Sequence, residues 1–558
     1  MRKLFPAIAL GVATALALAA CSGDPADDSS ANPSGNPAVG TQPLTIGMPN
    51  GTQQNNSNPF TGTSSAMSLG YANAIYEPLV QVNAINSAID PVPWLATDWT
   101  WNDDFTSVTF TVRDGVKWSD GEDLTADDVA YSIQMRKDVP AINTSALPYG
   151  DITQSDNTVT VTFTSPQYVN QNKVLTLIVV PKHIWSAIAD PTTDLNQNPI
   201  GSGPYVLNRW SSEAVSLLPN PNYWGGTPAV PELLYSSYTD NNALTTALVA
   251  GDIQWGWTFI SDYENVYIAK DSAHNNFWAP SGLGADVLYL NTETKPFNDP
   301  AMRVALSMVI DRTAIFEIAS EGVFPEVTSV TGMPTPAGDP YMSDAYKGKD
   351  YEVDVDGAKA VLADAGYTLK DGKLFDPDGV QVTFTLTDPA GWNDYLTALQ
   401  QIADAAKALG IDATVDAANV DAWFANIGTG DFQAALHWTD TGATPWDMYS
   451  DIMDGAQYVP AGENANWNFG RFQNAEVTAA LATYASSPDE GSRTEAMDTI
   501  QKVFVEQQPA IIIRARPAPA EFSTKYYVGW PSAENPYAEV QPTRPNVAMI
   551  LMNLKPAS

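Results

Sequence analysis

The stretch from Val382 to Met453 constrains the fold most strongly, because it predicts two strands of a parallel-type sheet joined through helices. Each predicted strand stops in a loop rich in Trp, Asp, Gly and Pro, at Asp388–Trp392 and at Trp438–Trp446. In open α/β sheets, ligands bind beyond the carboxyl ends of the strands. We therefore expect these two loops to form one wall of a binding cleft.

Chain length and charge narrow the possible classes of protein. A chain of 558 residues is too long for a single hydrophobic core, so several domain-sized units are expected. The formal net charge of −37 argues against nucleic acid or anionic lipid as a partner, because both are bound through clusters of Lys and Arg. With one Cys and three His, a disulfide framework, a thiolate zinc site and a His-rich metal site are not expected, and neither is a cofactor.

The N-terminus predicts an exported and anchored protein. Residues 1–21 consist of a short positive segment and an apolar run that ends in Leu18-Ala-Ala-Cys21. This ending resembles the bacterial lipobox, in which the Cys thiol is lipidated and becomes the first residue after cleavage. Residues 22–42 are rich in Ser, Gly, Pro, Asn and Asp and predict a flexible tether. We expect a lipoprotein signal peptide, lipidation of Cys21 and a globular body at the extracellular face of the bacterial cytoplasmic membrane.

The sequence contains no recognisable set of catalytic residues. No H-E-x-x-H or G-x-S-x-G motif occurs, and the single Cys is used by the lipobox. His437 precedes Trp438 at a predicted strand end and could line the cleft, but no partner for it as a base can be named. The 64 acidic residues are compatible with a glycosidase-type carboxylate pair, yet no recognisable setting for one occurs. We therefore expect no enzyme and keep a surface-tethered hydrolase as a remote alternative.

The 16 Trp residues are the most informative for binding. A pyranose ring packs its C–H groups on an indole face, while amides and carboxylates take its hydroxyl groups. Clefts that bind peptides also use aromatic side chains to form roomy pockets, and packing in the core is the alternative for each Trp taken alone. The Trp residues that lie at or just after predicted strand ends are Trp255, Trp257, Trp392, Trp438 and Trp446.

Five ordered blocks of the chain carry a resemblance to a known family. They are IYEPLV at 75–80, PWLATDWTWNDDFTSVTFTVRDGVKWSDGEDLTADDVAYSI at 93–133, the segments PIGSGPYVL and LLPNPNYWGG within 199–226, LYLNTETKPFNDPAMRVALSMVIDRTAI at 288–315, and the helical segment 475–513. These blocks resemble the family 5 extracellular solute-binding proteins, the receptors of ABC importers for peptides, nickel and oligosaccharides.

The resemblance implies a two-lobed α/β fold of the periplasmic-binding-protein type, type II, with three subdomains. Lobe I would comprise residues 43–76, 204–275 and 518–558, with an inserted subdomain at 77–203, and lobe II would comprise 276–517. Ligand would be enclosed between the lobes by hinge closure, with crossings near 275 and 517, and delivered by a monomer to the transmembrane subunits of an ABC permease.

One comparison within the family separates peptide from sugar. Peptide-binding members share Trp-x-x-Asp-x-x-x-Pro, in which the Asp pairs with the α-ammonium group of the ligand. Here the spacing from Trp438 to Pro445 is kept, but Thr441 occupies the Asp position and Asp440 lies one residue away. A neutral hydroxyl cannot supply the charge-assisted hydrogen bond that a carboxylate makes with a cation. Trp446 and Asp447, which follow, look more like the oligosaccharide-binding members.

The preferred ligand is therefore a neutral oligosaccharide, such as a β-glucan or xylan fragment, and an oligopeptide or dipeptide is the alternative. A purely adhesive surface protein that binds without lobe closure is a further possibility. The candidate ligand-binding residues are Trp255, Trp257, Trp392, Trp438, Asp440, Thr441, Trp446 and Asp447.

Overall fold

The computed structural model describes residue 40 and residues 42–85 and 89–558. Cys21, the predicted signal peptide and all of the predicted tether except residues 40 and 42 lie outside the described residues. Within the described ranges, no helix has both the length and the apolar character that a membrane crossing requires.

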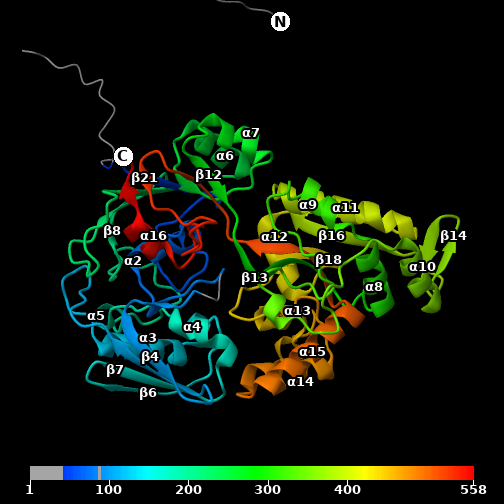
Figure 1. Ribbon diagram of the computed structural model, residues 1–558, viewed down its shortest axis with the longest axis horizontal. Helices are drawn as coiled ribbons and strands as arrows, with labels where there is room; N and C mark the ends of the chain where they lie inside the picture. Colours follow the sequence, from blue (N-terminus) through cyan, green and yellow to red (C-terminus); the bar gives the residue numbers. More distant parts are fainter. Residues whose placement is uncertain (1–39, 41, 86–88) are drawn as a thin grey trace, which may run out of the picture. The chain divides into compact units, whose positions relative to one another are not determined.

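The stretch singled out in the sequence lies in a five-stranded sheet (Figure 1). The predicted pair of parallel strands is confirmed, since β16 pairs with β18 through Leu386–Ala434 and Thr387–Ala435. A third strand, β17, follows the first helix and pairs with β16 in parallel. The order across the sheet is β17 (Asp412–Ala418), β16 (Thr383–Pro389), β18 (Ala434–Trp438), β13 (Ser281–Leu290) and β19 (Ala510–Pro517).

Helices cover both faces of this sheet, and the side chains of β13 alternate between two cores. Val287 and Tyr289 pack into one core with residues of α13, α14 and α15, whereas Leu288 and Leu290 pack into the other with residues of α8 and α11. Apolar side chains on both faces explain why β13 is buried along almost its whole length. β13 and β19 pair in antiparallel fashion and carry Asp286 opposite Arg514.

Two further sheets are formed by other parts of the chain. The seven-stranded sheet runs β12 (Asn275–Trp278), β20 (Ala520–Ser523), β11 (Trp255–Gly256), β1 (Leu44–Met48), β10 (Leu233–Ser237), β9 (Val215–Pro219) and β8 (Tyr205–Trp210). The antiparallel four-stranded sheet runs β4 (Ala96–Trp101), β5 (Ser107–Val112), β7 (Thr158–Phe163) and β6 (Tyr149–Ser155). Short ribbons pair β2 (Val80–Gln81) with β3 (Val92–Pro93), β14 (Thr368–Lys370) with β15 (Lys373–Phe375), and β21 (Tyr527–Val528) with β22 (Lys555–Pro556).

Helix ends follow local sequence signals. The α-helices are α1 (Ser65–Leu69), α2 (Ala72–Ile75), α3 (Ala126–Asp138), α4 (Gln171–Leu175), α5 (Lys182–Trp185), α6 (Asn241–Ala250), α7 (Tyr263–Val266), α8 (Pro300–Val309), α9 (Arg312–Ile318), α10 (Val355–Asp364), α11 (Asn393–Ala406), α12 (Val420–Thr429), α13 (Trp446–Met453), α14 (Ala475–Ser486), α15 (Glu490–Gln507) and α16 (Val547–Asn553). Thr125 and Asp128 form a capping box at the start of α3. Gly410, with φ +78°, ends the short 3₁₀ turn that follows α11, because a left-handed residue is needed there.

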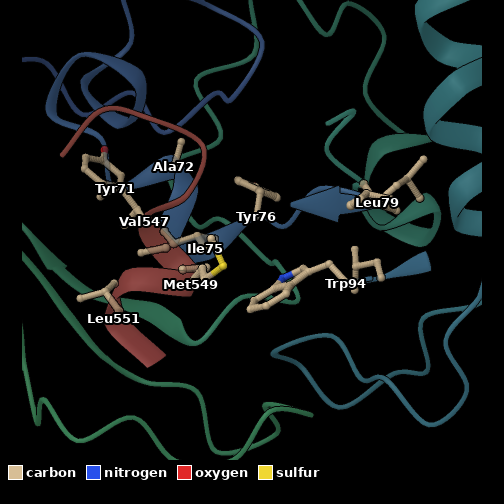
Figure 2. Packing of buried hydrophobic residues seen from close by; sticks show 14 of the residues in the cluster. Tyr71, Ala72, Ile75, Tyr76, Leu79, Trp94, Val547, Met549 and Leu551 are labelled. Atoms are coloured by element: carbon tan, nitrogen blue, oxygen red, sulfur yellow. The ribbon is translucent and has the colours of Figure 1, made fainter. Parts of the chain in front are cut away.

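The core beneath the seven-stranded sheet joins segments from the two ends of the chain. Figure 2 shows Val547, Met549 and Leu551 of α16 packed against the region of Ile75 at the end of α2. Glu77, the second residue after α2, is fully buried. Its Oε1 accepts hydrogen bonds from the Trp94 indole at 2.7 Å and the Tyr223 hydroxyl at 2.9 Å.

Burial raises the pKa of the Glu77 carboxyl from 4.5 to about 7, although its hydrogen-bond donors act in the opposite direction. The folded state therefore keeps this proton at pH values where the unfolded chain has released it. The contribution to stability is fully present below pH 4.5 and is lost as the pH rises through about 7. At most about 3 kcal/mol of unfolding free energy is involved.

We therefore predict that the unfolding free energy of the protein falls between pH 5 and pH 8, and that Glu77→Gln removes part of this fall. Gln has the shape of the protonated acid but does not titrate in this range. Chemical denaturation at several pH values measures the slope, and Glu122→Gln at an exposed position is the control. Equal slopes for Glu77→Gln and the unmodified protein would show that Glu77 does not titrate on unfolding.

Candidate ligand-binding site

One cavity combines aromatic, amide and ionised side chains, and its volume is about 270 Å³. The residues around it come from the regions of both larger sheets and from β19 with the link to β20. They are Met48, Pro49, Asn50, Asn241, Trp257, Thr258, Phe259, Gln541 and Arg544; Asp286, Phe324, Trp392, Asp394, Tyr395 and Trp438; and Arg514, Arg516, Pro517 and Pro519.

Two indoles reach the cavity from the strand ends of the five-stranded sheet. Trp438 is the last residue of β18, and Trp392 is the residue just before α11, in the loop after β16. Their ring centroids are 6.2 Å apart, with the planes inclined at 37°. Because both strands run parallel, their carboxyl ends meet at one edge of the sheet, which brings the two rings together. Both residues line the cavity, and their contact with a ligand stays a prediction.

A third indole lines the cavity from the region of the seven-stranded sheet. Trp257 follows β11 directly, is partly buried, and makes an edge contact with Phe324 at 5.8 Å between ring centroids. Asn50 and Asn241 contribute amide groups from the same region. The cavity therefore offers flat apolar faces beside hydrogen-bonding groups.

Trp255 does not line the cavity, which corrects its assignment as a ligand-facing residue. It lies inside β11, between β1 and β20, rather than after the strand as expected. Its side chain is fully buried, its indole N–H donates to the Val540 carbonyl at 2.8 Å, and its ring packs on Trp530 at 5.2 Å. Trp255 is thus a core residue of the seven-stranded sheet.

The loop after β18 is only partly turned toward the cavity. Trp446 begins α13, its indole N–H donates to the Leu481 carbonyl at 2.9 Å, and its ring packs on the core beside that helix. Thr441 lies against the backbone of β13, where a Cβ added at Gly284 would stand 2.3 Å from its hydroxyl oxygen. Neither residue lines the cavity, which corrects the expectation that the whole loop from Trp438 to Trp446 forms its wall.

Asp440 and Asp447 also lie outside the cavity lining, within a cluster of carboxyl groups. Asp447 is buried and forms an ion pair with Lys173 of α4, with 2.5 Å between Nζ and Oδ1. Asp451 accepts a hydrogen bond from the Asp440 backbone N–H at 2.7 Å. Burial raises the pKa of Asp451 well above its usual range, and Asp440 and Asp447 act in the same direction. Burial would lower the pKa of Lys173, but Asp447, Asp440 and Asp451 outweigh it and raise the pKa.

His437 is packed between aromatic rings. It lies between Trp423 at 5.4 Å and Trp438 at 4.1 Å between ring centroids, and its Nδ1 lies 2.9 Å from the Trp438 carbonyl oxygen. Burial lowers its pKa to about 3, so the imidazole is neutral at physiological pH. His437 does not belong to the cavity lining, so the structure does not support the possibility that it lines the cleft.

Arg514 lines the cavity and is the centre of a group of ion pairs. Its Nε donates to Asp286 at 2.7 Å, and its other guanidinium nitrogens donate to Asp394 at 2.6 Å and to the Ser320 hydroxyl at 3.0 Å. The Tyr395 hydroxyl donates to the second oxygen of Asp286 at 2.9 Å. The guanidinium side chain is 4% exposed, so this arrangement is a buried and fully hydrogen-bonded ion triad.

Arg516 lies two residues further along β19 and also lines the cavity. It donates to the Thr439 carbonyl at 3.0 Å, and its guanidinium carbon lies 4.8 Å from the centre of the Trp438 ring. The sequence reasoning missed Arg514, Arg516 and Lys173. The two arginines had a usable signal, since they stand two residues apart at the end of the apolar run Ile511–Ile513. Lys173 had none.

Among the described residues, no group of three or more His, Cys, Asp or Glu side chains is arranged to hold a metal ion. Asp388, at the end of β16, is fully buried rather than exposed to the cavity. Burial raises its pKa well above the usual range, and Asp394 and Asp286 add to this. The side chains that line the cavity offer stacking, hydrogen bonding and ion pairing.

Several known proteins are similar to this chain. It is 30% identical to Protein XP55 of Streptomyces lividans, over 72% of each chain, and 27% identical to the oligopeptide-binding protein AppA of Bacillus subtilis, over 71% of this chain and 73% of the relative. A solved periplasmic oligopeptide-binding protein of Thermotoga maritima superposes with a TM-score of 0.83 at 25% identity, covering 92% of this chain and 99% of that one. A mannohexaose-bound structure of that protein gives a TM-score of 0.80.

The fold is thus the two-lobed α/β fold of the periplasmic binding proteins. Residues 90–458 match the family described as bacterial extracellular solute-binding proteins, family 5. Proteins of this family are transport receptors rather than enzymes. Because the match spans more than half of the sequence, this chain belongs to the family 5 extracellular solute-binding proteins and is the substrate-binding component of an ABC importer.

Proposed function

We propose that the protein binds an oligosaccharide in the cavity lined by Trp257, Trp392 and Trp438 and delivers it to an ABC permease. The observation that carries the proposal is the convergence of three indoles on one cavity that also holds Asn50 and Asn241. Sugar rings present C–H groups to aromatic faces and hydroxyl groups to amides. The mannohexaose bound to the Thermotoga maritima relative supports this ligand class.

The acidic cluster near the cavity supports sugar over peptide. A peptide with a free α-ammonium group needs an ionised carboxylate as its partner. Here Asp447 is buried and already has an internal ammonium partner in the partly buried Lys173. Together with Thr441 in place of an Asp, this leaves Asp440 as the carboxylate of the cluster that a ligand cation would have to meet, and Asp440 lies outside the cavity lining.

A peptide ligand is the second candidate, because the names of several relatives favour it. They include the oligopeptide-binding protein of Bacillus subtilis, the dipeptide-binding protein of Escherichia coli and the glutathione-binding protein of Shigella flexneri. The roomy aromatic cavity suits apolar peptide side chains as well as sugar rings.

Capture proceeds by hinge closure, with lobe I at 43–76, 204–275 and 518–558, the inserted subdomain at 77–203, and lobe II at 276–517. The protein acts as a monomer. Its body is held at the extracellular face of the cytoplasmic membrane by a lipid on Cys21, after removal of the signal peptide, and residues 22–42 serve as the tether. The ion pair between Lys173 and Asp447 joins the inserted subdomain to lobe II.

The anchor is tested by Cys21→Ala expressed in a bacterial host. We predict that the unmodified protein sediments with the membrane fraction and incorporates a labelled fatty acid. Cys21→Ala should lose the label and leave the membrane. If the variant keeps the label, the lipid is attached at a residue other than Cys21, which contradicts the proposal.

The binding proposal is tested by titration calorimetry with mannohexaose, cello-oligosaccharides, xylo-oligosaccharides and short peptides. We predict binding of one sugar series without turnover, and a loss of about tenfold to a hundredfold in affinity in Trp438→Ala, because a buried stacking surface is removed. Trp99→Ala changes a partly buried Trp of β4 outside the cavity and is the matched control. Binding of peptides but of no sugar would replace the proposal by its alternative, and chemical conversion of a bound ligand would favour a hydrolase.

The internal ion pair is tested by Lys173→Met. Removing the cation leaves Asp447 buried without a counter-charge, which should cost about 3 kcal/mol of unfolding free energy at pH 8. The cost should be smaller at pH 5, where the carboxyl can take up a proton. Lys117→Met breaks the exposed pair of Lys117 with Asp123 and should cost less than about 1 kcal/mol. Equal, small effects of the two substitutions would contradict the role given to Lys173.

A further inference from the structure

Two arginines of β19 line the same cavity but differ in how their charges are balanced. Arg514 is paired with Asp286 and Asp394. Arg516 has no carboxylate within ion-pair distance in the part of the chain that the structure describes, and its hydrogen bond goes to the neutral carbonyl of Thr439. A partly buried guanidinium without a counter-charge is costly unless something else supplies the negative charge.

A second cation lines the cavity near Arg516. Arg544 donates to the Gln541 side chain at 3.0 Å and lies 3.6 Å from a carboxylate oxygen of Glu539, so one weak pair serves it. Burial lowers the pKa of Arg516 to about 10, and the charge of Arg544 acts in the same direction, while Tyr395, Asp286 and Asp440 act against it more weakly. The two guanidinium groups therefore repel each other across a space that belongs to the cavity.

The net charge of the cavity lining is opposite in sign to the net charge of the whole chain. Arg514, Arg516 and Arg544 face it together with Asp286 and Asp394, three positive charges against two negative ones. The whole chain carries a formal charge of −37, with 27 basic and 64 acidic residues. A net positive lining in so acidic a protein is the arrangement that a negatively charged ligand group requires.

We infer that Arg516, which lies over the Trp438 ring, forms with Arg544 of the same cavity lining a subsite for a carboxylate of the ligand. The inference rests on the proposed use of this cavity and adds that the ligand is acidic, which departs from the expectation of a neutral sugar. Planar guanidinium groups bind carboxylates through paired hydrogen bonds, and the carboxylate would neutralise the unbalanced charge. A uronic acid unit of an oligosaccharide and the carboxylate of a peptide share this chemistry.

Two matched pairs of probes separate the two sources of a carboxylate. Mannohexaose and the β-1,4-linked hexamer of mannuronic acid differ only in the group at C6, hydroxymethyl or carboxylate. A tetrapeptide and its C-terminal amide differ only in the terminal charge. We predict that calorimetry with the purified protein shows at least about tenfold tighter binding of the acidic member in one pair, and the pair that shows it identifies the source.

Variants assign this preference to Arg516. In Arg516→Gln the acidic and neutral members should bind equally, because the charge is lost while a hydrogen-bond donor to Thr439 remains. Arg516→Lys should keep part of the preference, since it keeps the charge but not the paired hydrogen bonds. Arg209→Gln, at an exposed position of β8 outside the cavity, should keep all of it. Circular dichroism melts establish that each variant is folded.

The inference is overturned if the unmodified protein shows no preference for the acidic member of either pair, or if Arg516→Gln keeps the preference while Arg209→Gln does too. The proposed function fails in a different way. Mannohexaose that binds as tightly as its acidic counterpart, with affinity that depends on Trp438, would leave the oligosaccharide receptor intact and remove only the carboxylate subsite.

Discussion

The buried ion triad of Arg514, Asp286 and Asp394 holds the binding region together. Asp286 lies on β13, Arg514 lies opposite it on β19, and Asp394 stands in the first turn of α11. Three charged groups taken out of water are stable only when each satisfies the others. The triad therefore fixes two neighbouring strands, β13 and β19, and the start of α11 in one geometry, and it sets the position of Trp392, which immediately precedes α11. The cavity depends on this fixed geometry.

The same triad explains why Arg516 has no ion-pair partner among the described residues. Because Asp286 and Asp394 are both engaged by Arg514, neither is free to balance the second arginine of the strand. The alternation of β19 places both arginines on the same side of the strand, where its apolar run ends at the cavity. The guanidinium of Arg514 thus stabilises the fold. The guanidinium of Arg516 is oriented by Thr439 and Trp438 and, in our proposal, binds the ligand. Lys173 shows the opposite case, because its charge is paired with Asp447 inside the protein.

Local patterns were enough to predict the elements of the five-stranded sheet that carry Trp392 and Trp438. The apolar run at Val382–Leu386, the helix that follows it and Gly410 gave the strand and helix of the five-stranded sheet, and Trp392 and Trp438 followed from the strand ends. The assignment of Trp255 to the cavity was wrong because β11 is only two residues long. The burial of Trp255 is decided by the pairing of β11 with β1 and β20, which are distant in sequence. Ion pairs such as Lys173 with Asp447 leave no local trace, since neither sequence neighbourhood indicates the other. The domain boundaries rest on resemblance and remain a proposal.

The central claim is that the cavity with Trp257, Trp392 and Trp438 receives the ligand, and fluorine NMR of the protein labelled with 5-fluorotryptophan tests it most directly. Single Trp→Phe substitutions assign the resonances. On saturation with the tightest-binding probe, the account predicts shifts for these three residues and an unmoved resonance for Trp255, which is buried in the core. Saturation that leaves all three unmoved while a Trp outside the cavity shifts would contradict it.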